Sequence, residues 1–262
     1  MKTTLYWFSG TGNSLRVARA IQEGLGDARL VPIAGAAGRP QEPAERVGLV
    51  FPVYAWGPPA IVERFIEDLP ADADTYVFAV MTYASNPGSA PQLTRRLLRE
   101  RGLELAAAYG VRMPENYPPL GGPPKPEKQQ RILAKAEARI AEVVAALRGS
   151  PRGRIEKRFL LWRGLGRLIH PMFRWSMPKA DRKFSVDETC NQCGLCAKVC
   201  PVGNIELVDG LPRWLGRCEQ CYACYHWCPQ QAIQRGWRTP GRSRYHHPAC
   251  KASDLVVRET GS

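Results

Sequence analysis

The first 150 residues alternate between short apolar stretches and segments with helical periodicity. Four stretches have the length and composition of buried strands, at residues 3–8, 29–33, 46–51 and 75–81. Segments in which apolar positions recur with helical spacing follow them, at residues 15–25, 60–69, 91–101 and 131–147. Because strands that alternate with helices form parallel sheets, this pattern predicts an α/β fold. With a fifth strand before Met113, we expect a doubly wound, five-stranded parallel sheet.

A short polar loop follows the first predicted strand and precedes the first predicted helix. It reads Ser9-Gly10-Thr11-Gly12-Asn13-Ser14. Backbone N–H groups at a helix N-terminus, together with the hydroxyls in this loop, form a binding site for a terminal phosphate. The loop lacks the Gly-Lys-Ser/Thr of a P-loop, and Leu15 stands where a dinucleotide-binding loop has its third glycine. A nucleotide with one terminal phosphate therefore fits better than NAD.

Two further loops follow the third and fourth predicted strands. Because ligands of open α/β sheets bind at the carboxyl ends of the strands, all three loops should border one site. Tyr54, Trp56 and Tyr83 offer flat apolar surface to an aromatic ring. The candidate binding residues of the first loop are Ser9, Thr11, Gly12, Asn13 and Ser14. Those of the later loops are Pro52, Val53, Tyr54, Ala55, Trp56, Gly57, Thr82, Tyr83, Asn86 and Gly88.

Cysteine is confined to the last third of the chain, where one motif occurs twice. Residues 1–189 contain no cysteine, and the two runs are Cys190-x2-Cys193-x2-Cys196-x3-Cys200-Pro201 and Cys218-x2-Cys221-x2-Cys224-x3-Cys228-Pro229. This spacing is that of bacterial ferredoxins, in which the fourth cysteine of each run ligates the other cluster. One 4Fe–4S cluster would take Cys190, Cys193, Cys196 and Cys228, and the other Cys218, Cys221, Cys224 and Cys200.

Other uses of the cysteines fit less well. A zinc ribbon would leave the third cysteine and the Cys-Pro of each run unexplained, and a disulfide framework would require a secreted chain. Since two clusters use eight cysteines, Cys250 receives no role. We expect His226, His246 and His247 to be structural.

These features divide the chain into three parts: residues 1–150, a connector at 151–183 and a small module at 184–262. The connector holds ten Lys or Arg and two Asp or Glu, interleaved with aromatic and aliphatic side chains. It fits three roles, of which packing between the domains is favoured over docking an acidic partner and over peripheral contact with an anionic membrane. Nucleic acid is not expected, because two oxidised clusters with their thiolates would add a charge of roughly −4 to the C-terminal module.

The strand that ends in Ser-Gly-Thr-Gly-Asn-Ser and the two aromatic loops resemble the FMN site of flavodoxins. Together with the paired cysteine runs, and with residues 113–117 and 245–248, they make the chain similar to the flavodoxin–ferredoxin fusion proteins of anaerobic microbes. The resemblance implies a flavodoxin-like FMN-binding domain followed by a small α+β ferredoxin-like domain with two 4Fe–4S clusters. One departure is the stretch 34–45, which is too short for a full crossover helix. The face of the sheet beside it should be bare, or covered by residues 131–147 or by the connector.

The favoured function is electron transfer between two 4Fe–4S clusters and FMN, which links a low-potential one-electron donor to a redox partner protein. The alternative is an FMN-dependent reductase of a small oxidant such as a quinone, in which the ferredoxin domain is the electron inlet. No Ser/His/Asp set or carboxylate pair indicates hydrolytic chemistry. The sequence shows neither an apolar signal segment nor a membrane span, so we expect a cytoplasmic protein.

Overall fold

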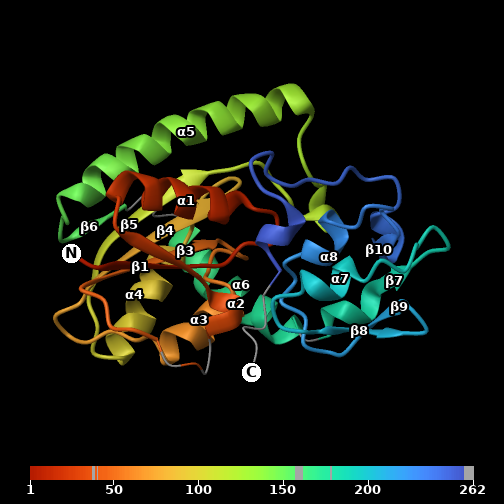
Figure 1. Cartoon of the computed structure of the whole chain (residues 1–262), viewed down its shortest axis with the longest axis horizontal. Helices are drawn as coiled ribbons and strands as arrows, with labels where there is room; N and C mark the ends of the chain where they lie inside the picture. Colours follow the sequence, from red (N-terminus) through yellow and green to blue (C-terminus); the bar gives the residue numbers. More distant parts are fainter. Residues whose placement is uncertain (37–38, 40, 157–161, 178, 257–262) are drawn as a thin grey trace.

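The computed structural model places a parallel sheet and its helices beside a smaller cysteine-rich module (Figure 1). The structure describes residues 1–36, 39, 41–156, 162–177 and 179–256, and it describes only the backbone of residues 162–168. Among these residues, no helix is both long and apolar enough to cross a bilayer.

The sheet has six parallel strands in the order β2-β1-β3-β4-β5-β6. The strands are β1 (Thr3–Trp7), β2 (Ala28–Pro32), β3 (Arg46–Pro52), β4 (Tyr76–Tyr83), β5 (Leu105–Arg112) and β6 (Arg154–Ile155). The order of the first five is that of flavodoxin-like doubly wound sheets, so the predicted fold class is confirmed.

The prediction of five strands is wrong, because β6 adds a sixth at the edge of the sheet. Arg154 and Ile155 pair with Ala107 and Ala108 of β5. Two residues are too few to show a strand period in the sequence. The sheet thus continues into the stretch that the sequence assigned to the connector.

Helices cover both faces of the sheet. On one face, α1 (Asn13–Leu25) packs against α5 (Pro126–Arg148), and both contribute to one apolar core. The other face carries α2 (Ile33–Ala36), α3 (Ala60–Glu67) and α4 (Ala90–Glu100) over a second core. As the short connection predicts, α2 is a single turn. Residues 131–147 do not cover the face beside α2, so that expectation is wrong, since α5 packs against α1 on the opposite face.

The connector forms helix α6 (Trp162–Ser176), with Pro171 inside it. Its later residues lie against the carboxyl ends of the strands, where Ile169 and Phe173 border a cavity. Met172 and Trp175 are exposed, and the Lys179 ammonium lies 5.1 Å from the centre of the Trp175 ring. Residues 157–161, which carry part of the predicted basic and aromatic pattern, lie outside the described residues.

The cysteine-rich module consists of two similar halves. Its small sheets are β7 (Phe184–Val186) with β10 (Ile233–Arg235), and β8 (Ile205–Val208) with β9 (Leu211–Trp214). Each cysteine run contains a one-turn helix, α7 (Leu195–Lys198) or α8 (Ala223–His226). Single 3-10 turns complete the chain: η1 (Pro118–Leu120), η2 (Ala180–Lys183), η3 (Gly236–Arg238) and η4 (Ala252–Asp254).

Candidate functional site

A cavity of about 430 Å³ opens at the carboxyl ends of the sheet strands, within the size range of cofactor sites. We call it the flavin cavity, after the ligand that the sequence predicts. The structure brings all three predicted loops to it. The predicted residues that line it are Ser9, Thr11, Asn13, Ser14, Pro52, Val53, Tyr54, Ala55, Trp56, Thr82, Tyr83 and Asn86.

The predicted residues Gly12, Gly57 and Gly88 do not line the cavity but shape the loops around it. Gly12 precedes α1 with a φ of 91°, and its N–H donates to the Ser9 hydroxyl oxygen at 2.9 Å. A Cβ atom at Gly57 would lie 2.3 Å from the His170 ring, and one at Gly88 would lie 2.3 Å from the Trp56 indole. Only glycine leaves room for these two side chains.

Two hydroxyl groups of the first loop, at Ser9 and Thr11, can donate hydrogen bonds to an anion. Besides the Ser9 oxygen, the Thr11 hydroxyl oxygen accepts a hydrogen bond, from the Asn116 amide at 2.6 Å. Because a hydroxyl that accepts can still donate, both O–H groups remain available to a phosphate. The Ser14 hydroxyl bonds to that of Thr82 at 2.8 Å, which joins the first loop to the end of β4.

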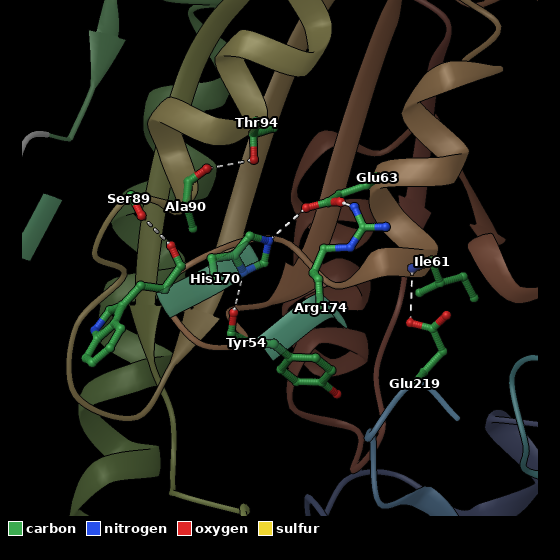
Figure 2. A network of polar contacts seen from close by, with 10 residues as sticks. Tyr54, Ile61, Glu63, Ser89, Ala90, Thr94, His170, Arg174 and Glu219 are labelled. Atoms are coloured by element: carbon green, nitrogen blue, oxygen red, sulfur yellow. Dashed lines mark hydrogen bonds and ion pairs between the residues drawn. The ribbon is translucent and has the colours of Figure 1, made fainter. Parts of the chain in front are cut away.

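The loop after β3 makes a tight turn at the cavity (Figure 2). Tyr54 and Gly57 exchange two backbone hydrogen bonds of 2.9 Å, and both residues between them have left-handed φ values, 46° at Ala55 and 62° at Trp56. Such values are unfavourable for residues with a Cβ. Two outside contacts hold the turn: the Ser89 hydroxyl donates to the Trp56 carbonyl at 2.9 Å, and His170 Nδ1 lies 3.2 Å from the Tyr54 carbonyl.

A buried polar network fastens α6 to this turn. His170 Nε2 lies 2.8 Å from a Glu63 carboxylate oxygen, and Arg174 pairs with the other oxygen of the same carboxylate (Figure 2). Burial lowers the pKa of His170, while its contact with the Tyr54 carbonyl raises it. Since α6 also places Ile169 and Phe173 on the cavity, it closes one side of the site.

Two cavity-lining polar atoms have no hydrogen-bond partner among the described residues. They are the Asn86 amide oxygen and the Tyr222 hydroxyl, and both are buried. Buried polar atoms are almost always satisfied. A planar ligand with donor and acceptor groups on its edge, as a flavin has, fits such a cavity.

The two cysteine runs cross over as the spacing predicts. One small cavity is lined by Cys190, Cys193, Cys196 and Cys228, and a second by Cys200, Cys218, Cys221 and Cys224. We call these groups the outer set and the inner set. Each takes three cysteines from one run and the fourth from the other.

The local backbone repeats between the runs. Gln192 and Gln220, at matching positions, have left-handed φ values of 60° and 49°. The next matching pair, Gly194 and Tyr222, precede α7 and α8 with φ values of 69° and 57°. The backbone therefore curls around each group of thiols in the same way.

The thiols of the inner set sit in a desolvated environment. Burial raises the pKa of Cys218 to about 12, and it also raises the pKa of Cys221 and Cys224. In the outer set, burial raises the pKa of Cys196 to about 11. Because burial disfavours a lone thiolate, iron must supply the compensating charge when these sulfurs act as ligands.

The profile of the 4Fe–4S binding domain matches residues 186–206, which contain the first cysteine run. The chain joins a flavodoxin-like domain to a 4Fe–4S binding domain. No curated protein matches the sequence.

Three solved structures of flavoproteins are similar to part of the chain. A flavoprotein in complex with FMN from Lactobacillus acidophilus is 13% identical over 42% of this chain and 92% of its own, with a TM-score of 0.34. A WrbA-like flavodoxin from Agrobacterium tumefaciens is 20% identical over 55% of this chain and 97% of its own, with a TM-score of 0.35. A flavodoxin variant from Pseudomonas aeruginosa is 20% identical over 57% of this chain and 100% of its own, with a TM-score of 0.38.

The cysteine-rich module and the flavodoxin-like domain meet at Cys221. Cys221 and Tyr222 line both the flavin cavity and the cavity of the inner set. A Cβ atom at Gly10 would lie 2.2 Å from the Cys221 carbonyl oxygen, and the Trp227 indole N–H donates to the Gly10 carbonyl at 3.0 Å. The predicted phosphate-binding loop at residues 9–14, called the phosphate loop below, therefore packs directly on the backbone of the second cysteine run.

Residues 245–250 pack against the phosphate loop from the other side. The Tyr245 hydroxyl donates to the Asn13 side chain at 2.7 Å, and the His247 N–H donates to the Thr11 carbonyl at 2.8 Å. Cys250 is buried beside Gly12. His226 accepts from the Tyr245 N–H and contacts the Asn116 carbonyl at 2.8 Å, so its contacts are structural.

Several residues of the site were not predicted from the sequence. The cavity also includes Ile169, Phe173, Gln220 and Cys221, which come from α6 and from the second cysteine run. Residues 113–117 also line the cavity, and the sequence pointed to them only through the resemblance to flavodoxin–ferredoxin fusion proteins. Gly12, Gly57 and Gly88 indicate close packing of their loops, but the sequence does not show which segment packs against each glycine.

Proposed function

We propose that this chain is an electron-transfer iron–sulfur flavoprotein that holds two 4Fe–4S clusters and one FMN. The observation that carries the proposal is the shared wall between the flavin cavity and the inner set, which Cys221 and Tyr222 form. A 4Fe–4S cluster exchanges one electron and a flavin one or two. Side chains that border both sites would hold the two kinds of cofactor next to each other.

The residues of the flavodoxin-like domain have distinct roles in this proposal. Ser9, Thr11 and the N-terminus of α1 bind the terminal phosphate. Tyr54 and Trp56 pack on the flavin ring system. The side-chain amide oxygen of Asn86 accepts a hydrogen bond from the edge of that ring system. The α6 helix excludes water from the cavity through Ile169 and Phe173.

A partner protein would exchange electrons with the outer set or with the flavin edge. The exposed part of the connector offers Trp175, Lys179, Arg182 and Lys183. Because Lys179, Arg182 and Lys183 attract negative charge, we expect a partner that docks there to be acidic. Its electron exchange with this chain should then slow as the salt concentration rises.

Anaerobic purification tests the cofactor content. We expect about eight iron and about eight acid-labile sulfide per chain, because two complete sets of four cysteines are present, and one FMN. A redox titration should resolve both kinds of centre. Recovery of FAD, or of about four iron, would contradict the proposal, and sustained turnover of a small oxidant such as a quinone would favour the reductase alternative.

A substitution in the phosphate loop tests the flavin site. Thr11 is buried, and Thr11→Leu replaces a hydroxyl donor with a bulkier apolar group. We expect FMN content to fall by at least about tenfold, the effect of losing one charge-assisted hydrogen bond to phosphate, while iron content stays unchanged. Flavin content equal to that of the wild type would contradict the phosphate assignment.

A further inference from the structure

A second cavity, of about 410 Å³, lies beside the flavin cavity, between the end of β5 and the first half of α5. We call it the α5 groove. Tyr83 lines both cavities. Five cations line the groove: Arg112, Lys128, Arg131, Lys135 and Arg139.

Four of these cations form one stripe on α5. Lys128, Arg131, Lys135 and Arg139 follow one another at intervals of three and four residues, so they share one side of the helix. The buried residues of α5 begin only at Ala136. The first turns of this long helix therefore contribute little to the core, and Figure 1 shows α5 continuing along the whole sheet. What these turns do contribute is the cationic wall of the groove.

Most of this positive charge has no ion-pair partner among the residues that the structure describes. Arg139 pairs with Glu142 and Glu156. Among the residues that the structure describes, no carboxylate forms an ion pair with Arg112, Lys128, Arg131 or Lys135, and all four are exposed. Four cations around one concavity repel each other, and a ligand with two or more negative charges would relieve that repulsion.

The floor of the groove is apolar and is opened by a glycine. Gly110 lies inside β5, where glycine weakens a strand. A Cβ atom there would lie 2.6 Å from the Tyr83 ring, so glycine lets that ring lie against the strand. Tyr83, Ile132 and Ala136 then give the groove apolar surface beside its cations.

We propose that the α5 groove binds a nucleoside polyphosphate, with its phosphates on Lys128, Arg131 and Lys135 and its ring system against Tyr83 and Ile132. The volume suits a ligand of that size, and cations beside an aromatic surface suit its two chemically different ends. Because the groove borders the flavin cavity through Tyr83, a bound nucleotide would lie next to the flavin. The groove uses cations that the proposed function does not, so either proposal can fail without the other.

Calorimetric titration of the flavin-loaded full chain tests this inference, with ADP, pyrophosphate and adenosine as probes in a low-salt HEPES buffer. We expect one saturable ADP site, weaker binding of pyrophosphate and no binding of adenosine. Arg131→Gln/Lys135→Gln should weaken ADP binding by at least about tenfold, because two charge-assisted contacts are lost. Iron and flavin contents should not change.

The matched control is Arg95→Gln/Arg99→Gln, which removes two exposed cations at the same spacing from α4, on the opposite face of the sheet. It should bind ADP as the wild type does. Equal weakening in both double variants would mean that ADP senses only the overall charge, and would overturn the proposal. So would the absence of saturable ADP binding, or pyrophosphate binding as tight as that of ADP.

Discussion

The outer and inner cysteine sets share one sequence motif but lie in different surroundings. Cys193 of the outer set is exposed, whereas Cys221 of the inner set forms part of the wall of the flavin cavity. A buried carboxylate in the second cysteine run, Glu219, ties this run to α3. It accepts hydrogen bonds from the Ile61 N–H at 3.1 Å and from Arg64 at 2.5 Å. The identical cysteine spacing therefore does not show which set lies next to the flavin cavity. Packing against the flavodoxin-like domain places the inner set there.

The largest effects should come from removing the crossed fourth ligands. Cys200→Ala should destroy the inner cluster and abolish electron transfer from the remaining cluster to the flavin. Cys228→Ala should destroy the outer cluster but keep the inner cluster in contact with the flavin. In each variant, iron should fall from about eight to about four per chain, and EPR of the reduced protein should show which cluster remains. Loss of the cluster of Cys190, Cys193 and Cys196 in Cys200→Ala would contradict the crossed ligation.

A smaller effect is expected at the contact between the phosphate loop and the inner set. Gly10→Ala would place a methyl group 2.2 Å from the Cys221 carbonyl oxygen, and such overpacking costs about 1–3 kcal/mol. The unfolding temperature should fall, and electron transfer between the inner cluster and the flavin should slow. Gly149→Ala is the control, because its new Cβ would be 3.6 Å from the nearest atom. Equal behaviour of the two variants would mean that the contact at Gly10 has no special importance.

A pH-dependent effect of similar size concerns the 245–250 segment on the other side of the phosphate loop. Burial lowers the pKa of His247 to about 4 from 6.5, so between these values the unfolded chain binds more protons than the folded one. Stability should therefore be highest above about pH 6.5 and fall as the pH is lowered toward 4, by up to about 3 kcal/mol from this residue.

His247→Asn tests this prediction, since the Asn oxygen can replace His247 Nδ1 as acceptor of the Ala249 N–H. Anaerobic thermal unfolding at pH 7 and pH 5 should show a smaller loss of stability in the variant than in the wild type. The same loss in both proteins would show that His247 does not carry the effect.

The local pattern predicted most of the sheet and all three loops that line the flavin cavity. Strands such as β3 and β4 are continuous apolar runs because they are buried on both faces, and each predicted loop follows such a run. The cysteine spacing likewise predicted which four cysteines line each small cavity, because the motif itself specifies the crossover.

What could not be predicted depends on contacts between distant segments. The two-residue strand β6 exists because it pairs with β5, and the placement of α5 depends on packing against α1. The approach of Cys221 to Gly10 joins residues more than two hundred positions apart. No local periodicity encodes such pairings.

The most direct test of the account is the rate of electron transfer between the clusters and the flavin. Rapid mixing with a low-potential donor under anaerobic conditions would reduce the clusters, and the flavin absorbance would then be followed at several protein concentrations. Since Cys221 borders both sites within one chain, we predict a rate independent of protein concentration, because the fusion fixes a high effective concentration. A rate that rises linearly with protein concentration would show that the two domains exchange electrons only between molecules, and would contradict the account.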